Sequence, residues 1–269
     1  MSQLEISPIS TKLDKLADQL ASTGYAILSA NSVCAWAGCT LESLNALAMS
    51  WHGMPSDQYL KDSGKYRRRR HSSFTYAEDR LLEAPHRAHW QPTTYNALHG
   101  GMNRWFEPIP QDVKSTVAWT GLMEAFAKTS IQLRSRTTGS EAASRQCMEA
   151  HQFRIDTTHG IGRPTPEGAH RDGVDLVGVF LVARKGIKGG ETRVFDAAGR
   201  SGERFTLQEP WSLLLLDDEK VIHETTPIQP TEAGGYRDTL VITSKQGSFL
   251  DELTGPCTER HSSIPAYKE

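Results

Sequence analysis

The chain of 269 residues is 38% hydrophobic and 23% charged, a composition typical of a folded globular protein with one large domain. Its formal net charge of −2 gives no electrostatic reason to expect nucleic acid or an anionic membrane as a partner. No apolar run approaches the ~20 residues that cross a bilayer, and the start of the chain lacks a secretion signal. We therefore expect a cytoplasmic, soluble protein with its four cysteines as free thiols.

Helical periodicity dominates the first half of the chain. Leucine and alanine recur at helical spacing over residues 13–21, and Gly24 follows as a C-terminal cap. Residues 24–30 then have the pattern of a strand, and residues 40–51 and 110–133 have the pattern of two further helices. These helices are amphipathic, so each is expected to pack one face against a core.

After about residue 145 the chain changes to short β-branched or aromatic segments, separated by Gly, Pro and Asp clusters. Their regular spacing is typical of a β-sandwich or closed barrel. We predict one domain (residues 1–269), in which a helix-rich part (1–145) packs on a β core (146–250) that is followed by a tail (251–269). The glycine-rich turn at residues 186–192 predicts a hairpin. The predicted strands are residues 148–156, 175–183, 191–196, 204–207, 211–218 and 238–244.

The segment EGAHRDG, directly before a strongly apolar strand, carries a candidate metal motif. His170 and Asp172 lie two residues apart, so in an extended chain their side chains point to the same side and can bind one ion. His223, just after another apolar strand, can supply a third ligand. Two histidines and one carboxylate leave three positions of an octahedral ion open, as in non-haem Fe(II) oxygenases, whereas zinc sites usually close tetrahedrally. The alternative is a salt-bridged turn, with His223 capping a loop.

Arg237 begins the last predicted core strand, and Thr239 follows two residues later on the same face. A planar guanidinium beside an open-sided iron can bind the distal carboxylate of a dicarboxylate co-substrate while the keto-acid end binds the metal. The pattern therefore predicts a co-substrate site next to the metal. The alternative is a surface arginine that pairs with Asp238.

Several of these segments together resemble the 2-oxoglutarate/Fe(II) dioxygenase family that contains the bacterial L-isoleucine dioxygenases and related free amino acid hydroxylases. The resemblance covers roughly residues 60–245 and is strongest over 164–196; the segments YRRRRHSSF, HQFRI, LLLLDDEKVIHETTPIQP and GYRDTLVI also contribute. It implies a mainly β fold with flanking helices, a double-stranded β-helix (jelly roll, cupin-like). It also implies Fe(II), 2-oxoglutarate and O2 as cofactors. The implied ligands of iron are His170, Asp172 and His223, and Arg237 is implied to bind 2-oxoglutarate.

The resemblance further implies hydroxylation of a free L-amino acid, with aliphatic ones among the candidates, coupled to decarboxylation of 2-oxoglutarate to succinate. The same oxidative chemistry on a carrier-bound amino acid or natural-product intermediate remains open, as hydroxylation, desaturation or cyclisation. A non-oxidative jelly-roll binding protein or a lyase would not need the clamp that Arg237 provides. We therefore expect a small-molecule amino acid as partner, and the sequence leaves a homodimer open.

The substrate contacts are expected near two polar segments. In an extended YRRRRHSSF segment, alternate arginines face opposite ways, so at most two can serve one site; a solvated strand or an ion-pair network is the alternative. In HQFRI, alternate residues likewise fall on two faces. The predicted substrate residues are Arg67, Arg69, His151, Phe153, Arg154 and Asp218, with Arg68 and Arg70 as further carboxylate-binding candidates. Acceptors available for the substrate ammonium are Glu167, Asp175, Asp217 and Asp218.

Overall fold

The computed structural model describes residues 6–138, 145–199 and 201–251, and its helices lie mostly in the first half of the chain. The helices are η1 Leu13–Lys15, α1 Leu16–Thr23, α2 Ala30–Ala37, α3 Leu41–Leu47, η2 Ala48–Trp51, α4 Gln111–Lys114 and α5 Val117–Thr138. The strands are β1 Tyr25–Leu28, β2 Arg67–Ala77, β3 Arg80–Glu83, β4 Gln146–Asp156, β5 Leu176–Lys185, β6 Ile187–Gly189, β7 Thr192–Asp196, β8 Gly202–Phe205, β9 Leu213–Asp217, β10 Val221–Thr225, β11 Ile228–Pro230 and β12 Tyr236–Gln246.

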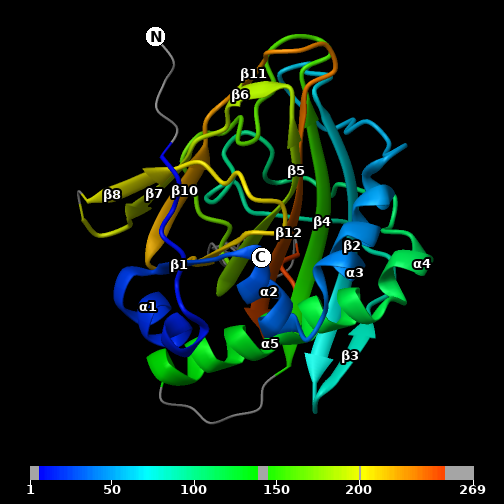
Figure 1. The fold of residues 1–269 in the computed structure, drawn as a ribbon. Helices are drawn as coiled ribbons and strands as arrows, with labels where there is room; N and C mark the ends of the chain where they lie inside the picture. The colour runs from blue at the N-terminus through cyan, green and yellow to red at the C-terminus, as the bar shows by residue number, and fades with distance from the viewer. Residues whose placement is uncertain (1–5, 139–144, 200, 252–269) are drawn as a thin grey trace, which may run out of the picture.

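Two antiparallel sheets form the body of the protein. The larger has seven strands in the order β1-β9-β5-β12-β4-β2-β3, and the smaller has three in the order β10-β7-β8. Figure 1 shows the smaller sheet projecting at the left, while α1, α2 and α5 lie toward the lower part of the view and α3 lies at the right. Strands β6 and β11 form a separate pair. The predicted jelly roll with flanking helices is confirmed.

The two faces of the larger sheet differ because side chains alternate along each strand. Strands β4 and β12 pair over their full length, so their alternation stays in phase. Even-numbered residues such as Ala150 and Ile242 join the apolar core under the helices. Odd-numbered residues such as His151 and Val241 face the space between the two sheets. A shift of one residue in register would exchange the two sets.

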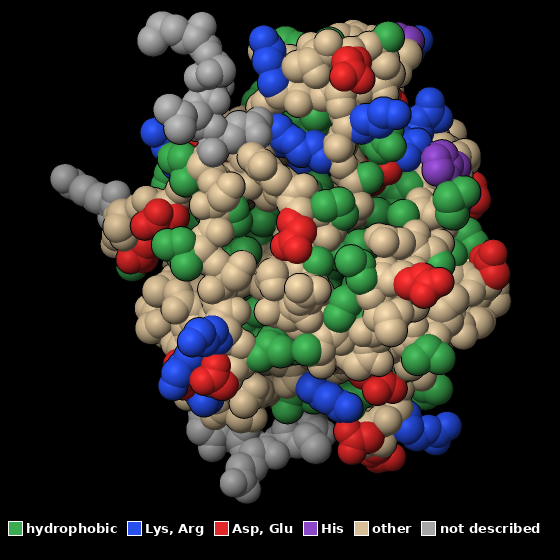
Figure 2. Space-filling view, in the orientation of Figure 1, with side chains coloured by type: hydrophobic (Ala, Val, Ile, Leu, Met, Phe, Trp, Pro, Cys, Tyr) green, Lys and Arg blue, Asp and Glu red, His purple; other side chains and the backbone are tan. Residues whose placement is uncertain are grey.

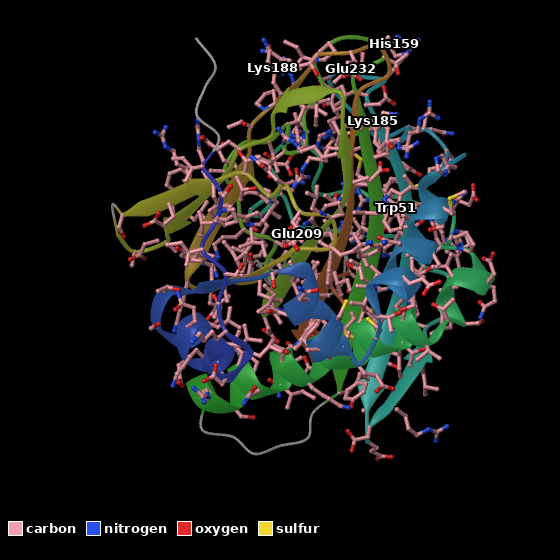
Figure 3. The ribbon with its side chains drawn as sticks, viewed as in Figure 1. Trp51, His159, Lys185, Lys188, Glu209 and Glu232 are labelled. Atoms are coloured by element: carbon pink, nitrogen blue, oxygen red, sulfur yellow. The ribbon has the colours of Figure 1, made fainter. Side chains whose placement is uncertain are left out.

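Helices α2, α3 and α5 cover the even-numbered face. Leu122 and Phe126 of α5 are completely buried in the main core. The indole N–H of Trp51, in η2, donates to the carbonyl oxygens of Phe153 and Thr239, at 3.1 and 3.3 Å (Figure 3). These contacts fix the helical layer to β4 and β12. They support our proposal that the helix-rich part and the β core form one domain.

A second apolar cluster closes one side of the space between the sheets. Leu214 and Leu216 of β9 pack there with Val194 of β7 and Val221 of β10. The β1–β9 side of the jelly roll is therefore filled with apolar side chains. A cavity remains on the opposite side, over β12, β4 and β2.

Some sequence expectations need correction. Each of the helices predicted at 40–51 and 110–133 is divided into two segments, α3 with η2 and α4 with α5. The hairpin predicted at 186–192 is wrong, because β6 pairs with β11 while the chain crosses from the larger sheet to the smaller one. Strand β2 was missing from the predicted strands, since its run of arginines hides the apolar alternation that identifies a strand.

The molecular surface bears charges of both signs. Figure 2 shows acidic and basic side chains dispersed over one face, with lysine and arginine gathered toward the upper end. In the described residues, no helix has both the length and the apolar character that a membrane span requires. Cys34, Cys39 and Cys147 are free thiols, as expected, whereas Cys257 lies outside the described residues.

Gly121 allows α5 to lie close to α2. Substitution of this glycine therefore tests how tightly the two helices pack. A Cβ added at Gly121 would lie 2.2 Å from the carbonyl oxygen of Ala37. We expect Gly121→Ala to lower the free energy of unfolding by about 1–3 kcal/mol, although alanine is the better helix former by about 1 kcal/mol. Urea unfolding measures this. Lys128→Ala, at an exposed position of the same helix, is the control; an equal or higher stability of Gly121→Ala would contradict the close contact.

Candidate metal and co-substrate site

His170 and His223 lie opposite each other where the loop before β5 meets β10. Their backbones exchange two hydrogen bonds, each 3.0 Å long, and their ring centroids lie 4.6 Å apart. The hydroxyl of Thr165 holds this loop on β10, because it donates to the carbonyl oxygen of Thr225 and accepts from its amide. The chain therefore brings together two histidines that are 53 residues apart.

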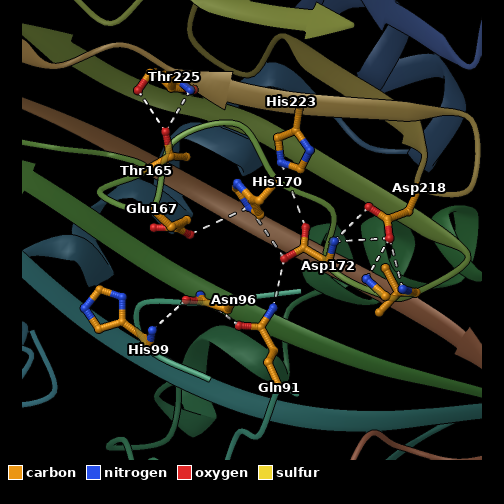
Figure 4. A network of polar contacts seen from close by, with 12 residues as sticks. Gln91, Asn96, His99, Thr165, Glu167, His170, Asp172, Asp218, His223 and Thr225 are labelled. Atoms are coloured by element: carbon orange, nitrogen blue, oxygen red, sulfur yellow. Dashed lines mark hydrogen bonds and ion pairs between the residues drawn. The ribbon is translucent and has the colours of Figure 1, made fainter. Parts of the chain in front are cut away.

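The third member of the triad, Asp172, lies beside both rings (Figure 4). Its two oxygens lie 3.8 Å from Nε2 of His170 and 3.9 Å from Nε2 of His223. These distances are too long for hydrogen bonds, so the three groups converge without bonding one another. Nδ1 of His170 donates to the carbonyl oxygen of Gly168 at 3.0 Å, which leaves Nε2 with a free lone pair. The residues thus fit a His/Asp/His metal site, and His170, Asp172 and His223 are its candidate ligands.

The carboxylate of Asp172 is oriented by polar neighbours. The amide of Gln91 donates to its Oδ1 at 3.0 Å. Asp218 accepts hydrogen bonds from three consecutive backbone amides, those of Asp172, Gly173 and Val174, at 2.7–3.1 Å. Asp218 therefore holds the turn that carries the metal-binding carboxylate, and Figure 4 shows both contacts.

Burial and neighbouring charges shift the pKa values in this site in different directions. Burial lowers the pKa of His223 well below its usual range, and the nearby His170 lowers it further. Burial also lowers the pKa of His170, but the carboxylates of Asp172 and Glu167 outweigh it and raise that pKa. Burial, with the charge of Asp172, raises the pKa of Asp218 to about 6. The site therefore concentrates negative charge beside two imidazoles, which suits a cation.

Arg237 lies in the same cavity, with Thr239 two residues away on the same face of β12. Its side chain is only 4% exposed, and burial followed by the charge of Arg184 lowers its pKa to about 10. Among the described residues, no carboxylate lies within salt-bridge distance of Arg237, and Asp238 pairs with Arg154 instead. The predicted alternative, a surface arginine paired with Asp238, does not describe this residue. A buried, unpaired guanidinium is costly unless an anion binds it.

One cavity of about 120 Å³ contains the triad, Arg237 and Thr239. The sheet floor of the cavity consists of odd-numbered residues of β4 and β12, as the alternation requires. Its apolar lining includes Phe153, Val174, Val179, Val241 and Leu250.

Three arginines line the cavity on the side of β2. Arg67 donates to Asp57 at 2.7 Å, Arg69 contacts Nδ1 of His151 at 3.0 Å, and Arg104 donates to the side-chain oxygen of Gln91 at 3.0 Å. Each keeps one buried nitrogen without a hydrogen-bond partner: NH2 of Arg67, Nε of Arg69 and Nε of Arg104. The cavity wall therefore contains three guanidinium groups whose hydrogen-bonding capacity is only partly used within the protein.

The predicted substrate residues on β2 and β4 lie on two different faces of these strands, and only one face lines the cavity. Arg67, Arg69, His151 and Phe153 line the cavity. Arg154 lies on the opposite face, where it makes two hydrogen bonds to Asp238. The remaining arginines of β2 also bond elsewhere. Arg68 donates to the carbonyl oxygen of Met54 and Arg70 pairs with Glu107.

The four candidate acceptors for an ammonium group differ in whether they line the cavity. Glu167 lines the cavity, and its Oε2 is buried without a hydrogen-bond partner. The carboxylates of Asp175 and Asp218 bond backbone amides instead. Asp217 accepts from the amide of Glu219. Of the four, only Glu167 lines the cavity within the described residues.

Sequence reasoning missed several residues of the cavity wall. Gln91 and Arg104 come from the long segment between β3 and α4, which has no regular period. His89 lies in the same segment, and Glu149 lies on β4 two residues before His151. For Glu149, the alternation that placed His151 and Phe153 on one face was a usable signal. For the other three, the sequence contains no comparable signal.

The chain matches the family model described as 2OG-Fe dioxygenase over residues 48–243. It is similar to the crystal structure of a bsmA homologue from Methylobium petroleophilum PM1, with 44% identity, 91% of this chain and 97% of that chain covered, and a TM-score of 0.83. IDO from Bacillus thuringiensis (14% identity, 90% and 99% covered, TM-score 0.71) and the Fe(II)/α-ketoglutarate-dependent dioxygenase TqaL (17%, 88% and 90%, 0.63) share the fold. No curated protein sequence matches the chain.

The triad predicts the effect of Asp172→Ala. Because the substitution removes the anionic ligand, we expect the affinity for Fe(II) to fall by at least about tenfold, together with succinate formation from 2-oxoglutarate. Anaerobic Fe(II) titration and succinate assays measure the two effects. Asp14→Ala, at an exposed position of η1, is the matched control and is expected to behave as the unsubstituted protein. Undiminished iron binding by Asp172→Ala would place the metal elsewhere.

Proposed function

Because the chain belongs to the 2OG-Fe dioxygenase family, whose members use Fe(II), 2-oxoglutarate and O2, we propose that it hydroxylates a free L-amino acid. The observation that carries this proposal is one small cavity with two separate anion-binding positions. Arg237 lies on β12, and Arg69 and Arg104 lie on the β2 side. One position suits the co-substrate, and the other suits the carboxylate of a second small molecule.

The bound cofactors supply the oxidising chemistry: one oxygen atom of O2 enters a C–H bond of the substrate, and the other enters succinate as 2-oxoglutarate loses CO2. The chain contributes binding, orientation and exclusion of water. We assign metal binding to His170, Asp172 and His223. Gln91 and Asp218 keep the carboxylate of Asp172 in place.

We assign the distal carboxylate of 2-oxoglutarate to Arg237. Its buried guanidinium can donate two parallel hydrogen bonds to a carboxylate, a geometry that a lysine cannot provide. Thr239, on the same face, offers a hydroxyl beside it. Binding of the dianion compensates the buried charge of Arg237, so the co-substrate also stabilises this part of the cavity.

We assign the carboxylate of the substrate to Arg69, with Arg104 beside it. Arg69 is 4% exposed and Arg104 is 2% exposed, and each keeps Nε unpaired. The guanidinium of Arg69 lies between the rings of Phe106 and Phe153, at 4.2 and 4.7 Å from their centroids. This stacking fixes the plane of the Arg69 guanidinium group. An aliphatic side chain can then pack against Val179, Val241 and Leu250.

The co-substrate assignment predicts a selective defect in Arg237→Ala. We expect the KM for 2-oxoglutarate to rise by the equivalent of ~1.5–3 kcal/mol, as for a lost charge-assisted hydrogen bond, while the KM for the amino acid changes much less. Steady-state succinate assays with each substrate varied in turn measure the two effects. Arg136→Ala, at an exposed position of α5, controls for loss of an arginine. An unchanged KM for 2-oxoglutarate would move the clamp to another residue.

The substrate assignment is tested on a panel of free L-amino acids with Fe(II), 2-oxoglutarate and O2. We expect succinate formation with at least one amino acid and a product that is 16 Da heavier by mass spectrometry; a loss of 2 Da would indicate desaturation. The methyl ester of the accepted amino acid is expected to be a poor substrate, because it lacks the charge that Arg69 binds.

The matching variant is Arg69→Ala, for which we expect a higher KM for the amino acid. Equal turnover of the ester and the acid, together with an unchanged KM in Arg69→Ala, would contradict carboxylate binding and favour a carrier-bound substrate.

A further inference from the structure

Four titratable side chains form a buried cluster in the cavity wall, apart from the metal triad. Glu149 accepts from Nε2 of His71 at 3.1 Å and from Nδ1 of His89 at 3.0 Å. The ring of His151 stacks on His71, with centroids 4.7 Å apart. Glu149 is 7% exposed, and it lines the cavity together with His89 and His151.

The hydrogen bonds in this cluster fix the protonation of its members. Although burial alone would raise the pKa of Glu149, His89 and His71 hold it well below its usual range. Burial lowers the pKa of His71, and it lowers that of His89 to about 3. Burial therefore favours the neutral form of both histidines, in which each ring donates its single N–H to the carboxylate. The free nitrogens, Nδ1 of His71 and Nε2 of His89, can only accept.

The charge of Glu149 has no direct cationic partner in the protein. Among the described residues, no lysine or arginine nitrogen lies within 4.0 Å of its carboxylate. The nearby Arg69 bonds His151 instead. Two neutral histidines satisfy part of the hydrogen-bonding capacity of Glu149, and Arg69 and Arg104 act on its charge only from beyond ion-pair distance, so this buried carboxylate lacks a direct ion pair.

The cluster has the composition of a metal site, but its surroundings disfavour a second metal ion. Nδ1 of His151 lies 3.0 Å from a guanidinium nitrogen of Arg69, and Arg104 adds a second cation to the field around it. A divalent ion at this cluster would therefore lie beside two buried positive charges. A singly charged group that donates several hydrogen bonds meets less repulsion.

We propose that Glu149, oriented by His71 and His89, binds the ammonium group of the substrate. The proposal rests on the proposed function and names the residue that selects for the amine. Ammonium offers only donors, whereas Glu149 and the free nitrogen of His89 offer only acceptors. The neighbouring arginines offer only donors, which match a carboxylate. An acceptor patch beside a donor patch is complementary to the zwitterion of an amino acid.

Glu149 is better placed for this role than Glu167. Oε1 of Glu167 lies 3.7 Å from Nε2 of His170, so an ammonium bound there would lie beside the metal ion. Like charges repel strongly in a buried cavity. Glu149 lies on β4 of the larger sheet, whereas the metal triad lies on β10 and the loop before β5. Among the described residues, the carboxylate of Glu149 makes its ion-pair and hydrogen-bond contacts with His71 and His89 and none with the metal triad, so an ammonium bound there need not contact a ligand of the metal.

The test compares an accepted amino acid with the matching 2-hydroxy acid, in which a hydroxyl replaces the ammonium. In the unsubstituted protein we expect kcat/KM for the amino acid to exceed that for the hydroxy acid by on the order of 10–100-fold. In Glu149→Gln this preference is expected to collapse toward unity, mainly through a higher KM for the amino acid. Glu149→Asp, which keeps the charge, is expected to retain part of the preference. Glu83→Gln, at an exposed position of β3, is the control.

Two further measurements separate the possible failures. Binding of Fe(II) and 2-oxoglutarate to Glu149→Gln, measured anaerobically, is expected to match the unsubstituted protein and shows that the variant is folded. A normal preference for the amine in Glu149→Gln would overturn the role of Glu149. The role of Glu149 would also be overturned if the unsubstituted protein bound a second equivalent of iron or zinc and Glu149→Gln did not. If the unsubstituted protein oxidises no amino acid, the proposed function itself fails.

Discussion

The register between β4 and β12 is the constraint on which the site depends. These strands pair residue by residue along their whole length, and β2 pairs with the other edge of β4. Side chains of one parity therefore enter the cavity from all three strands, and those of the other parity enter the apolar core beneath the helices. Arg237, Arg69 and Glu149 therefore all lie on the cavity face of the sheet. On the opposite face of the sheet, Trp51 anchors the helical layer to the backbone of β4 and β12.

Buried charge is the second feature that organises the cavity. In most protein interiors an arginine or glutamate is paired, yet among the described residues Arg237 has no carboxylate, and Glu149 has no lysine or arginine, within salt-bridge distance. Their burial lowers the stability of the protein without ligands, and ligands of matching charge restore part of it. Binding selectivity then follows from the same cost, because a neutral analogue leaves one of these charges uncompensated.

The sequence predicted those parts of the site that depend on short spacings. His170 and Asp172 share one side of an extended segment, and Arg237 with Thr239 shares one face of a strand; local geometry indicated these pairs, and the family resemblance favoured them over a salt-bridged turn and a surface arginine. The role of Asp218 could not be predicted, because a sequence does not show which backbone amides will surround a carboxylate. The positions of Gln91, His89 and Arg104 depend on an irregular segment whose course is set by tertiary packing. Alternation along the strand placed Arg154 and Phe153 on opposite faces. The sequence did not show which of these faces lines the cavity, because that depends on the pairing of the strands.

Under the proposed function, the division of charge across the cavity would also allow two similar anions to be distinguished. Both 2-oxoglutarate and an amino acid carry a carboxylate, so an arginine alone cannot distinguish them. Among the described residues no carboxylate lies within salt-bridge distance of Arg237, whereas Arg69 contacts His151 in the same wall as Glu149. An amino acid can compensate both charges in that wall, while the second carboxylate of 2-oxoglutarate would meet Glu149 as a like charge. Repulsion from Glu149 would therefore keep the co-substrate out of the substrate position, and attraction alone would not achieve this.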